Sequence, residues 1–245
     1  MDIRKIMRTS RSLLIIKLTI GIIFAASGQI KNDEDIFYVL NVSGADLYEN
    51  SSLDSRIMGK LKVGEMIVAS EILRTRHSKK IGEEFYLDGY FIKIRNEDSY
   101  KYVFSADLTK FKPVMRDVYK GILIPDINGE KINDRIVKRT EKYGDAVYEL
   151  EDIITEYENV TYTYTAFDGC FDHIYAYRNL TLSEVYHLLT IHHLNINETE
   201  LEILFPRFIE KRGNEYLFQG EGATEDLKLT ENEDGSLSIS SYDCT

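Results

Sequence analysis

Short runs of alternating hydrophobic and polar positions, separated by turn residues, fill most of the chain and predict a mostly β protein. Asp88-Gly89 is the strongest predicted hairpin turn in the first half, because Asp-Gly adopts the left-handed backbone conformation of tight turns. The predicted strands between residues 36 and 111 are 37–40, 45–48, 57–61, 66–69, 84–87, 90–94 and 100–104. Many short strands with closely spaced turns indicate a small barrel.

A boundary is predicted at Lys112-Pro113, where the regular strand pattern ends and a proline restricts the preceding residue. Residues 114–245 are predicted to form a second, α+β domain, an antiparallel β-meander with one helix. Its turns are predicted at Gly144-Asp145 and Asp234-Gly235. Its predicted strands are 135–143, 146–157, 161–165, 171–177, 201–209, 216–219, 227–230 and 237–241.

The one predicted helix begins after Thr181. Thr181 followed by Glu184 forms a capping-box pattern, in which the hydroxyl and the carboxylate satisfy amide groups at the helix start. Leu182, Val185 and Leu189 then fall on one helical face, so this face is expected to pack on the sheet.

The N-terminus has the three-part pattern of a secretory signal peptide over residues 1–28. A basic stretch to Arg11 precedes an apolar stretch, and small residues at Ala26 and Gly28 predict cleavage before Gln29. The alternative is a retained membrane anchor, but Lys17 leaves an apolar run well under the roughly 20 residues needed to span a bilayer. We therefore expect a secreted or periplasmic protein with no membrane span after signal removal.

The net charge of the chain limits the classes of binding partner that can be expected. The formal net charge is −11, and residues 1–28 carry five Lys or Arg against one Asp, so their removal leaves −15. Such a surface repels phosphate backbones, so nucleic acid is not expected as a partner. The sequence has no glycine-rich phosphate loop, and no cofactor is expected.

The two cysteines, Cys170 and Cys244, become informative if the chain is exported. An even count in an oxidising compartment predicts a disulfide bond between them. Two separately buried thiols are the alternative.

Residues 36–111 resemble the bacterial SH3-like (SH3b) family. The resemblance rests on Gly44-Ala45-Asp46-Leu47-Tyr48, on the turn Gly59 to Glu65, on Gly89 to Ile94 and on Tyr102-Val103-Phe104-Ser105 with Leu108. It implies that the first domain is a small SH3-like β-barrel.

The resemblance also implies noncatalytic binding in the bacterial cell envelope, to peptidoglycan peptide or to a protein partner. Aromatic side chains line the groove of such barrels, and a predicted basic loop containing His77, Lys79 and Lys80 could dock carboxylates. The candidate ligand-binding residues are Tyr48, Tyr86, Tyr90, Tyr100, Arg74 and Arg76.

Two other function classes remain open at this point. The first is a Cys-dependent cell-wall hydrolase, with Cys170 as nucleophile and His187, His192 or His193 as base. The three histidines lack the regular spacing of helical metal ligands, so no metal site is predicted. The second class is an acidic immunity or inhibitor-type protein that blocks a basic partner.

Overall fold

The computed structural model describes residues 36–96, 99–197, 199 and 202–244, so the predicted signal peptide lies outside the described residues. The described chain is mostly β, as predicted, and contains one α-helix. The described residues form one compact unit.

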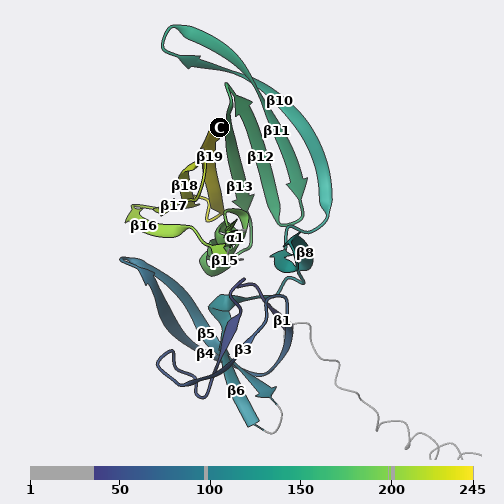
Figure 1. The fold of residues 1–245 in the computed structure, drawn as a ribbon, viewed down its shortest axis with the longest axis vertical. Helices are drawn as coiled ribbons and strands as arrows, with labels where there is room; N and C mark the ends of the chain where they lie inside the picture. Colours follow the sequence, from purple (N-terminus) through teal and green to yellow (C-terminus); the bar gives the residue numbers. More distant parts are fainter. Residues whose placement is uncertain (1–35, 97–98, 198, 200–201, 245) are drawn as a thin grey trace, which may run out of the picture. The chain divides into compact units, whose positions relative to one another are not determined.

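The first sheet, which includes the strands labelled β1, β3, β4, β5 and β6 in Figure 1, is antiparallel. Its strand order is β3-β2-β6-β5-β4-β1-β7. A short 3-10 turn, η2, at Ser105–Asp107 leads into its last strand. The strands are β1 (Ile36–Val39), β2 (Ala45–Tyr48), β3 (Ile57–Leu61), β4 (Met66–Gly82), β5 (Phe85–Asn96), β6 (Ser99–Phe104) and β7 (Leu108–Thr109). A hairpin, β8 (Val114–Tyr119) with β9 (Ile122–Asp126), follows as a separate two-stranded sheet.

The second large sheet has the order β10-β11-β12-β13-β19-β18-β17-β16 and is also antiparallel. It curls into a half-barrel and not a closed barrel, because its end strands β10 and β16 do not pair with each other in the described chain. Its strands are β10 (Lys131–Tyr143), β11 (Ala146–Tyr157), β12 (Val160–Phe167), β13 (Cys170–Tyr177), β16 (Arg207–Arg212), β17 (Glu215–Gln219), β18 (Thr224–Glu231) and β19 (Leu237–Cys244). A small pair, β14 (Asn195–Asn197) with β15 (Glu202–Leu204), separates the two parts of this sheet in the sequence.

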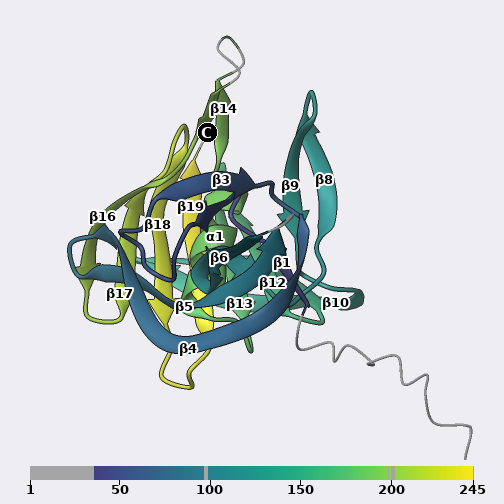
Figure 2. The same ribbon diagram turned by 90° about the horizontal axis from the view of Figure 1, so that it is seen from below.

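The predicted helix is confirmed as α1 (Leu182–His192) with a complete capping box. The Thr181 side chain accepts from the Glu184 amide, and the Glu184 carboxylate accepts from the Thr181 amide at 2.8 Å. α1 lies between the two large sheets (Figure 1), and in the view from below it lies near the centre of the molecule's described part (Figure 2). Val185 and Leu189 are fully buried there, as their spacing predicted.

Two hydrophobic clusters hold the described chain together. One fills the first sheet and includes Phe37, Leu47, Ile92 and Val103. The other joins residues from both sides of the predicted boundary at Lys112-Pro113. Its buried members from the first sheet are Leu40, Tyr48, Phe85, Leu87, Phe91 and Phe104, and those from later elements include Val160, Tyr177, Leu188, Tyr216, Phe218 and Ile239.

Two of the predicted hairpin turns are confirmed, at Gly144-Asp145 and at Asp234-Gly235. The prediction of a turn at Asp88-Gly89 is wrong. Strand β5 continues through these two residues, and Gly89 lies opposite His77 of β4. The chain reverses instead around Glu84, which takes a positive φ of 58°. Gly89 is needed for close approach, since a Cβ there would lie 2.8 Å from Ser105 Oγ and 2.9 Å from Phe104 Cε2.

The predicted basic loop is also wrong. Arg74, Arg76, His77, Lys79 and Lys80 all lie within β4, a strand of 17 residues that pairs with β5. Residues 74–80 include no apolar side chain, so this stretch lacks the alternation of apolar and polar positions by which a strand is predicted.

The predicted strand 201–209 is interrupted. β15 ends at Leu204 and β16 begins at Arg207, with Phe205 and Pro206 between them. Proline has no backbone N–H to donate to a strand ladder, which explains the break.

Candidate functional site

A cavity of about 570 Å³ opens where β4 and β5 meet the start of α1. Its floor is apolar and its rim carries charged and hydroxyl groups, so we call it the Tyr90 pocket. Its lining residues are Phe37, Arg74, Arg76, Asp88, Gly89, Tyr90, Ser105, Ala106, Leu108, Thr109, Lys110, Phe111, Asn179, Thr181, Ser183 and Glu184.

The backbone around Tyr90 is fixed by the neighbouring 3-10 turn. The Tyr90 amide donates to Ser105 Oγ at 2.9 Å. Gly89 leaves room for this contact, because any side chain at that position would collide with Ser105 and Phe104. The Tyr90 ring is half-buried, which leaves one part of it available to a ligand.

The helix start closes the other side of the pocket. Ser183 Oγ donates to the backbone carbonyl of Asp88 at 3.3 Å, so α1 is attached to β5 directly beside Tyr90. Glu184 is buried and its carboxylate accepts from the Thr181 amide and hydroxyl, both at 2.8 Å. Glu184 therefore serves the helix cap rather than a ligand.

Arg76 and Arg74, two cations on the rim, differ in whether their guanidinium groups are free to bind a ligand. Arg76 forms an ion pair with Asp88, and this hydrogen bond, aided by one from Ser78 and opposed by partial burial, lowers the pKa of Asp88. Arg74 is exposed and forms no ion pair within the described part of the chain. Arg74 therefore has a guanidinium free to bind an anion in the pocket.

Lys110 adds a second cation. Its Nζ lies 5.7 Å from the ring centre of Phe37, over the apolar floor, and it too has no ion-pair partner among the described residues. Burial raises the pKa of Tyr90; the nearby charge of Arg74 opposes this rise and that of Glu184 adds to it. The Tyr90 hydroxyl thus stays protonated at neutral pH and can donate a hydrogen bond.

The structure brings three of the six predicted binding residues together: Arg74, Arg76 and Tyr90 line the pocket. Tyr48 is only 4% exposed and packs edge-on against Phe91 in the core. Tyr86 and Tyr100 are exposed but do not line the pocket, and Tyr100 lies under Lys93 Nζ at 4.6 Å.

The sequence reasoning missed Lys110, Phe111 and the helix start as parts of this site. Lys110 follows β7, and Thr181 lies about 90 residues after Tyr90, so only the tertiary fold places them together. The capping box was visible in the sequence, but nothing in it indicated which strand it would face.

Three residues of the hydrolase alternative, Cys170, His187 and His192, have other partners. Cys170 is bonded to Cys244, which confirms the predicted pairing. His187 Nε2 lies 2.9 Å from the Ala106 carbonyl oxygen, whereas His192 Nε2 lies 2.8 Å from the Tyr177 hydroxyl. No group of three metal-ligating side chains suited to a metal ion is present in the described residues.

His187 helps to attach α1 to the first sheet. Its Nε2 lies 3.4 Å from Asp107 Oδ1, and Asn41 Nδ2 donates to the same carboxylate at 2.9 Å. Burial disfavours the Asp107 charge, but His187, Lys79 and Asn41 outweigh it and lower the pKa of this carboxyl.

Comparison of the chain with protein-family models, with curated proteins and with solved structures finds no match. No helix in residues 36–96, 99–197 or 202–244 is long and apolar enough to cross a bilayer. The Tyr90 pocket is therefore interpreted from its own geometry.

Proposed function

We propose that the protein is a noncatalytic binding protein of the bacterial cell envelope, and that its ligand is a carboxylate-bearing peptide of the cell wall. The observation that carries the proposal is the Tyr90 pocket, where Arg74 and Lys110, both without ion-pair partners among the described residues, flank an apolar and aromatic floor. A short peptide with apolar side chains and a terminal carboxylate complements both features.

Residues 36–111 act in this proposal as an SH3-like barrel. The support is the run of short antiparallel strands from β1 to β7 around a core of Phe37, Leu47 and Val103. A second support is that Tyr90, which lines the pocket, lies within Gly89 to Ile94, one of the segments that resemble the family.

Export to an oxidising compartment is part of the proposal. The Cys170–Cys244 disulfide supports it, because such bonds persist in secreted and periplasmic proteins and are rare in the cytosol of most organisms. The same bond counts against a Cys-dependent hydrolase, since a sulfur held in a disulfide is not a thiolate nucleophile.

Calorimetry with synthetic stem peptides tests the carboxylate contact. Arg74→Gln should weaken binding by about 10- to 100-fold, because a charge-assisted hydrogen bond contributes about 1.5–3 kcal/mol. Arg95→Gln is the matched control, since Arg95 is an exposed arginine of β5 outside the pocket. A C-terminally amidated peptide should lose the same factor with the wild-type protein but not with Arg74→Gln. Equal binding by all variants would refute the proposed site.

A further inference from the structure

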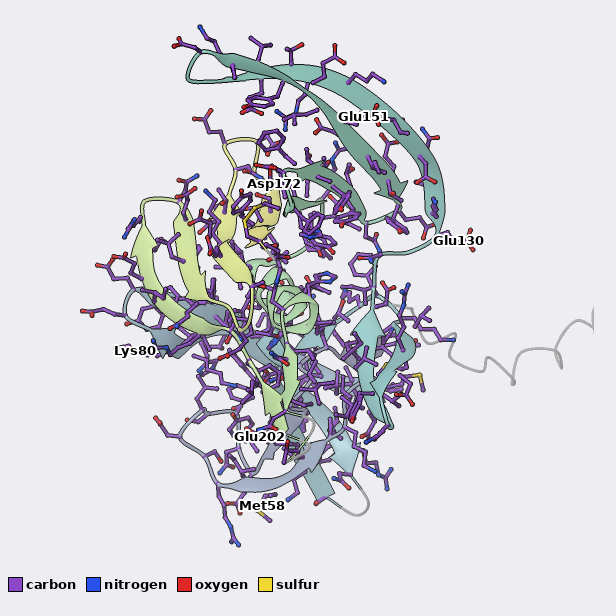
Figure 3. The ribbon with its side chains drawn as sticks, turned by 45° about the horizontal axis from the view of Figure 1, so that its top comes forward. Met58, Lys80, Glu130, Glu151, Asp172 and Glu202 are labelled. Atoms are coloured by element: carbon purple, nitrogen blue, oxygen red, sulfur yellow. A yellow bond between two sulfur atoms is a disulfide. The ribbon has the colours of Figure 1, made fainter. Side chains whose placement is uncertain are left out.

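The half-barrel ends in an open strand edge. In the described part of the chain β10 pairs with β11 alone, so its outer edge presents backbone N–H and C=O groups without a strand partner. β10 spans 13 residues, whereas β16 at the opposite end spans 6. Figure 3 shows the β10–β11 hairpin with Glu151 labelled on it. Long open edges are the usual sites of strand addition.

A row of apolar side chains runs across the sheet from β12 to β10 and ends at this edge. Ile136 on β10 is 61% exposed and lies directly opposite Ile153 of β11, which is 43% exposed. Tyr164 of β12 is the next residue in the same row. Exposure of isoleucine side chains to water is energetically unfavourable, so we expect another protein surface to bury this row.

The charges along β10 favour one particular cover, a second copy of the same strand. If two β10 strands pair antiparallel with Ile136 opposite Ile136, then Asp134 of each copy faces Lys138 of the other. This register contains that attractive pair twice and no like-charge pair. Cross-strand opposite charges stabilise a sheet, whereas like charges directly opposite destabilise it.

The two registers shifted by two residues are less favourable, because they bring like charges opposite each other. Sliding one strand by two residues in one direction places Arg135 opposite Arg139, and in the other direction places Arg135 opposite itself. Basic residues on an edge usually deter pairing for this reason. The pattern on β10 disfavours both registers shifted by two residues and admits the one that places Ile136 opposite Ile136.

The side chains concerned remain accessible. Asp134 contacts Lys131 and Lys138 contacts Glu151 within one chain, and all four are at least half-exposed. Such exposed ion pairs are weak and can exchange partners readily.

We propose that the protein forms a symmetric homodimer through antiparallel pairing of β10 with β10 of a second copy, centred on Ile136. The two half-barrel sheets then become one continuous sheet, and the Ile153–Ile136 row of one copy meets that of the other. This proposal is independent of the Tyr90 pocket.

Sedimentation equilibrium at low salt tests the pairing. The wild-type chain should show twice the monomer mass at about 100 µM. Asp134→Lys alone and Lys138→Asp alone should each weaken dimerisation by about tenfold or more, because each variant creates two like-charge pairs. The double variant should dimerise again, and an equimolar mixture of the two single variants should form heterodimers.

The Ile136→Lys variant provides a second test of the dimer. It should yield a monomer, since it places two charges at the symmetry axis, whereas Ile174→Lys should not. Ile174 is a matched control, because it is a 43% exposed isoleucine of β13, away from the edge. Circular dichroism confirms that each variant is folded. A monomeric wild type, or a dimer that Ile136→Lys and the single charge variants leave intact, would overturn the proposal.

Discussion

Cys170 and Cys244 lie directly opposite each other on β13 and β19, with their Cα atoms 4.2 Å apart and their sulfurs bonded. The bond closes a loop of 74 residues that contains α1 and strands β14 to β18. It therefore links the last strand of the chain to the centre of the half-barrel.

Removal of this disulfide should destabilise the protein. Cys170→Ser with Cys244→Ser should lower the free energy of unfolding by about 2–5 kcal/mol, chiefly through the greater freedom of the unfolded chain. Guanidinium denaturation measured beside the oxidised wild type checks this. A loss below about 1 kcal/mol would show that strand pairing alone holds the C-terminus.

Stability should fall in mild acid because two histidines are held neutral. Burial lowers the pKa of His192 to about 3 and that of His193 to about 4. In the unfolded chain both titrate near about 6.5, so between these values the unfolded chain binds more protons. Their contribution is fully present above about pH 6.5 and is lost as the pH falls toward 4.

The size of this effect can be measured through His193. Its Nε2 is buried without a hydrogen-bond partner among the described residues, so His193→Gln removes a titrating group and no described hydrogen bond of that nitrogen. The slope of unfolding free energy against pH between 4.5 and 6 should fall by at most about 1.4 kcal/mol per pH unit. An unchanged slope would mean that His193 is protonated in the folded protein.

Gly89→Ala should disrupt the Tyr90 pocket. The new Cβ would lie 2.8 Å from Ser105 Oγ and 3.0 Å from the Ala106 amide nitrogen, so β5 must move away from the 3-10 turn. We expect a loss of about 1–3 kcal/mol in thermal or denaturant unfolding.

Gly59→Ala is the control for this substitution. Gly59 is a strand glycine whose Cβ would make only an ordinary contact, 3.6 Å from Leu47 Cδ1. Its effect should stay within about 0.5 kcal/mol. Equal losses for both variants would refute the close-approach explanation.

The sequence predicted local features well where one or two neighbouring residues determine them. The capping box of Thr181 with Glu184 and the turn at Gly144-Asp145 depend on short-range hydrogen bonds and backbone preferences, and both are confirmed. The mostly β class followed from the same local patterns.

Features that depend on tertiary packing were not predictable in this way. Asp88-Gly89 has the composition of a turn, but contact with Ser105 and Phe104 keeps it extended. Tyr48 had the side chain of a binding residue, yet packing against Phe91 buries it. The pocket itself joins segments about 90 residues apart, and no local pattern indicates that contact.

Co-sedimentation with purified peptidoglycan tests the central claim, that the Tyr90 pocket binds cell-wall peptide. A chain of residues 29–245 should pellet with the wall at low salt, and its Tyr90→Ala variant should remain in the supernatant although it is folded. Tyr100→Ala should pellet like the wild type, because Tyr100 is a 52% exposed tyrosine outside the pocket. Absence of wild-type pelleting, or equal pelleting of Tyr90→Ala, would contradict the account.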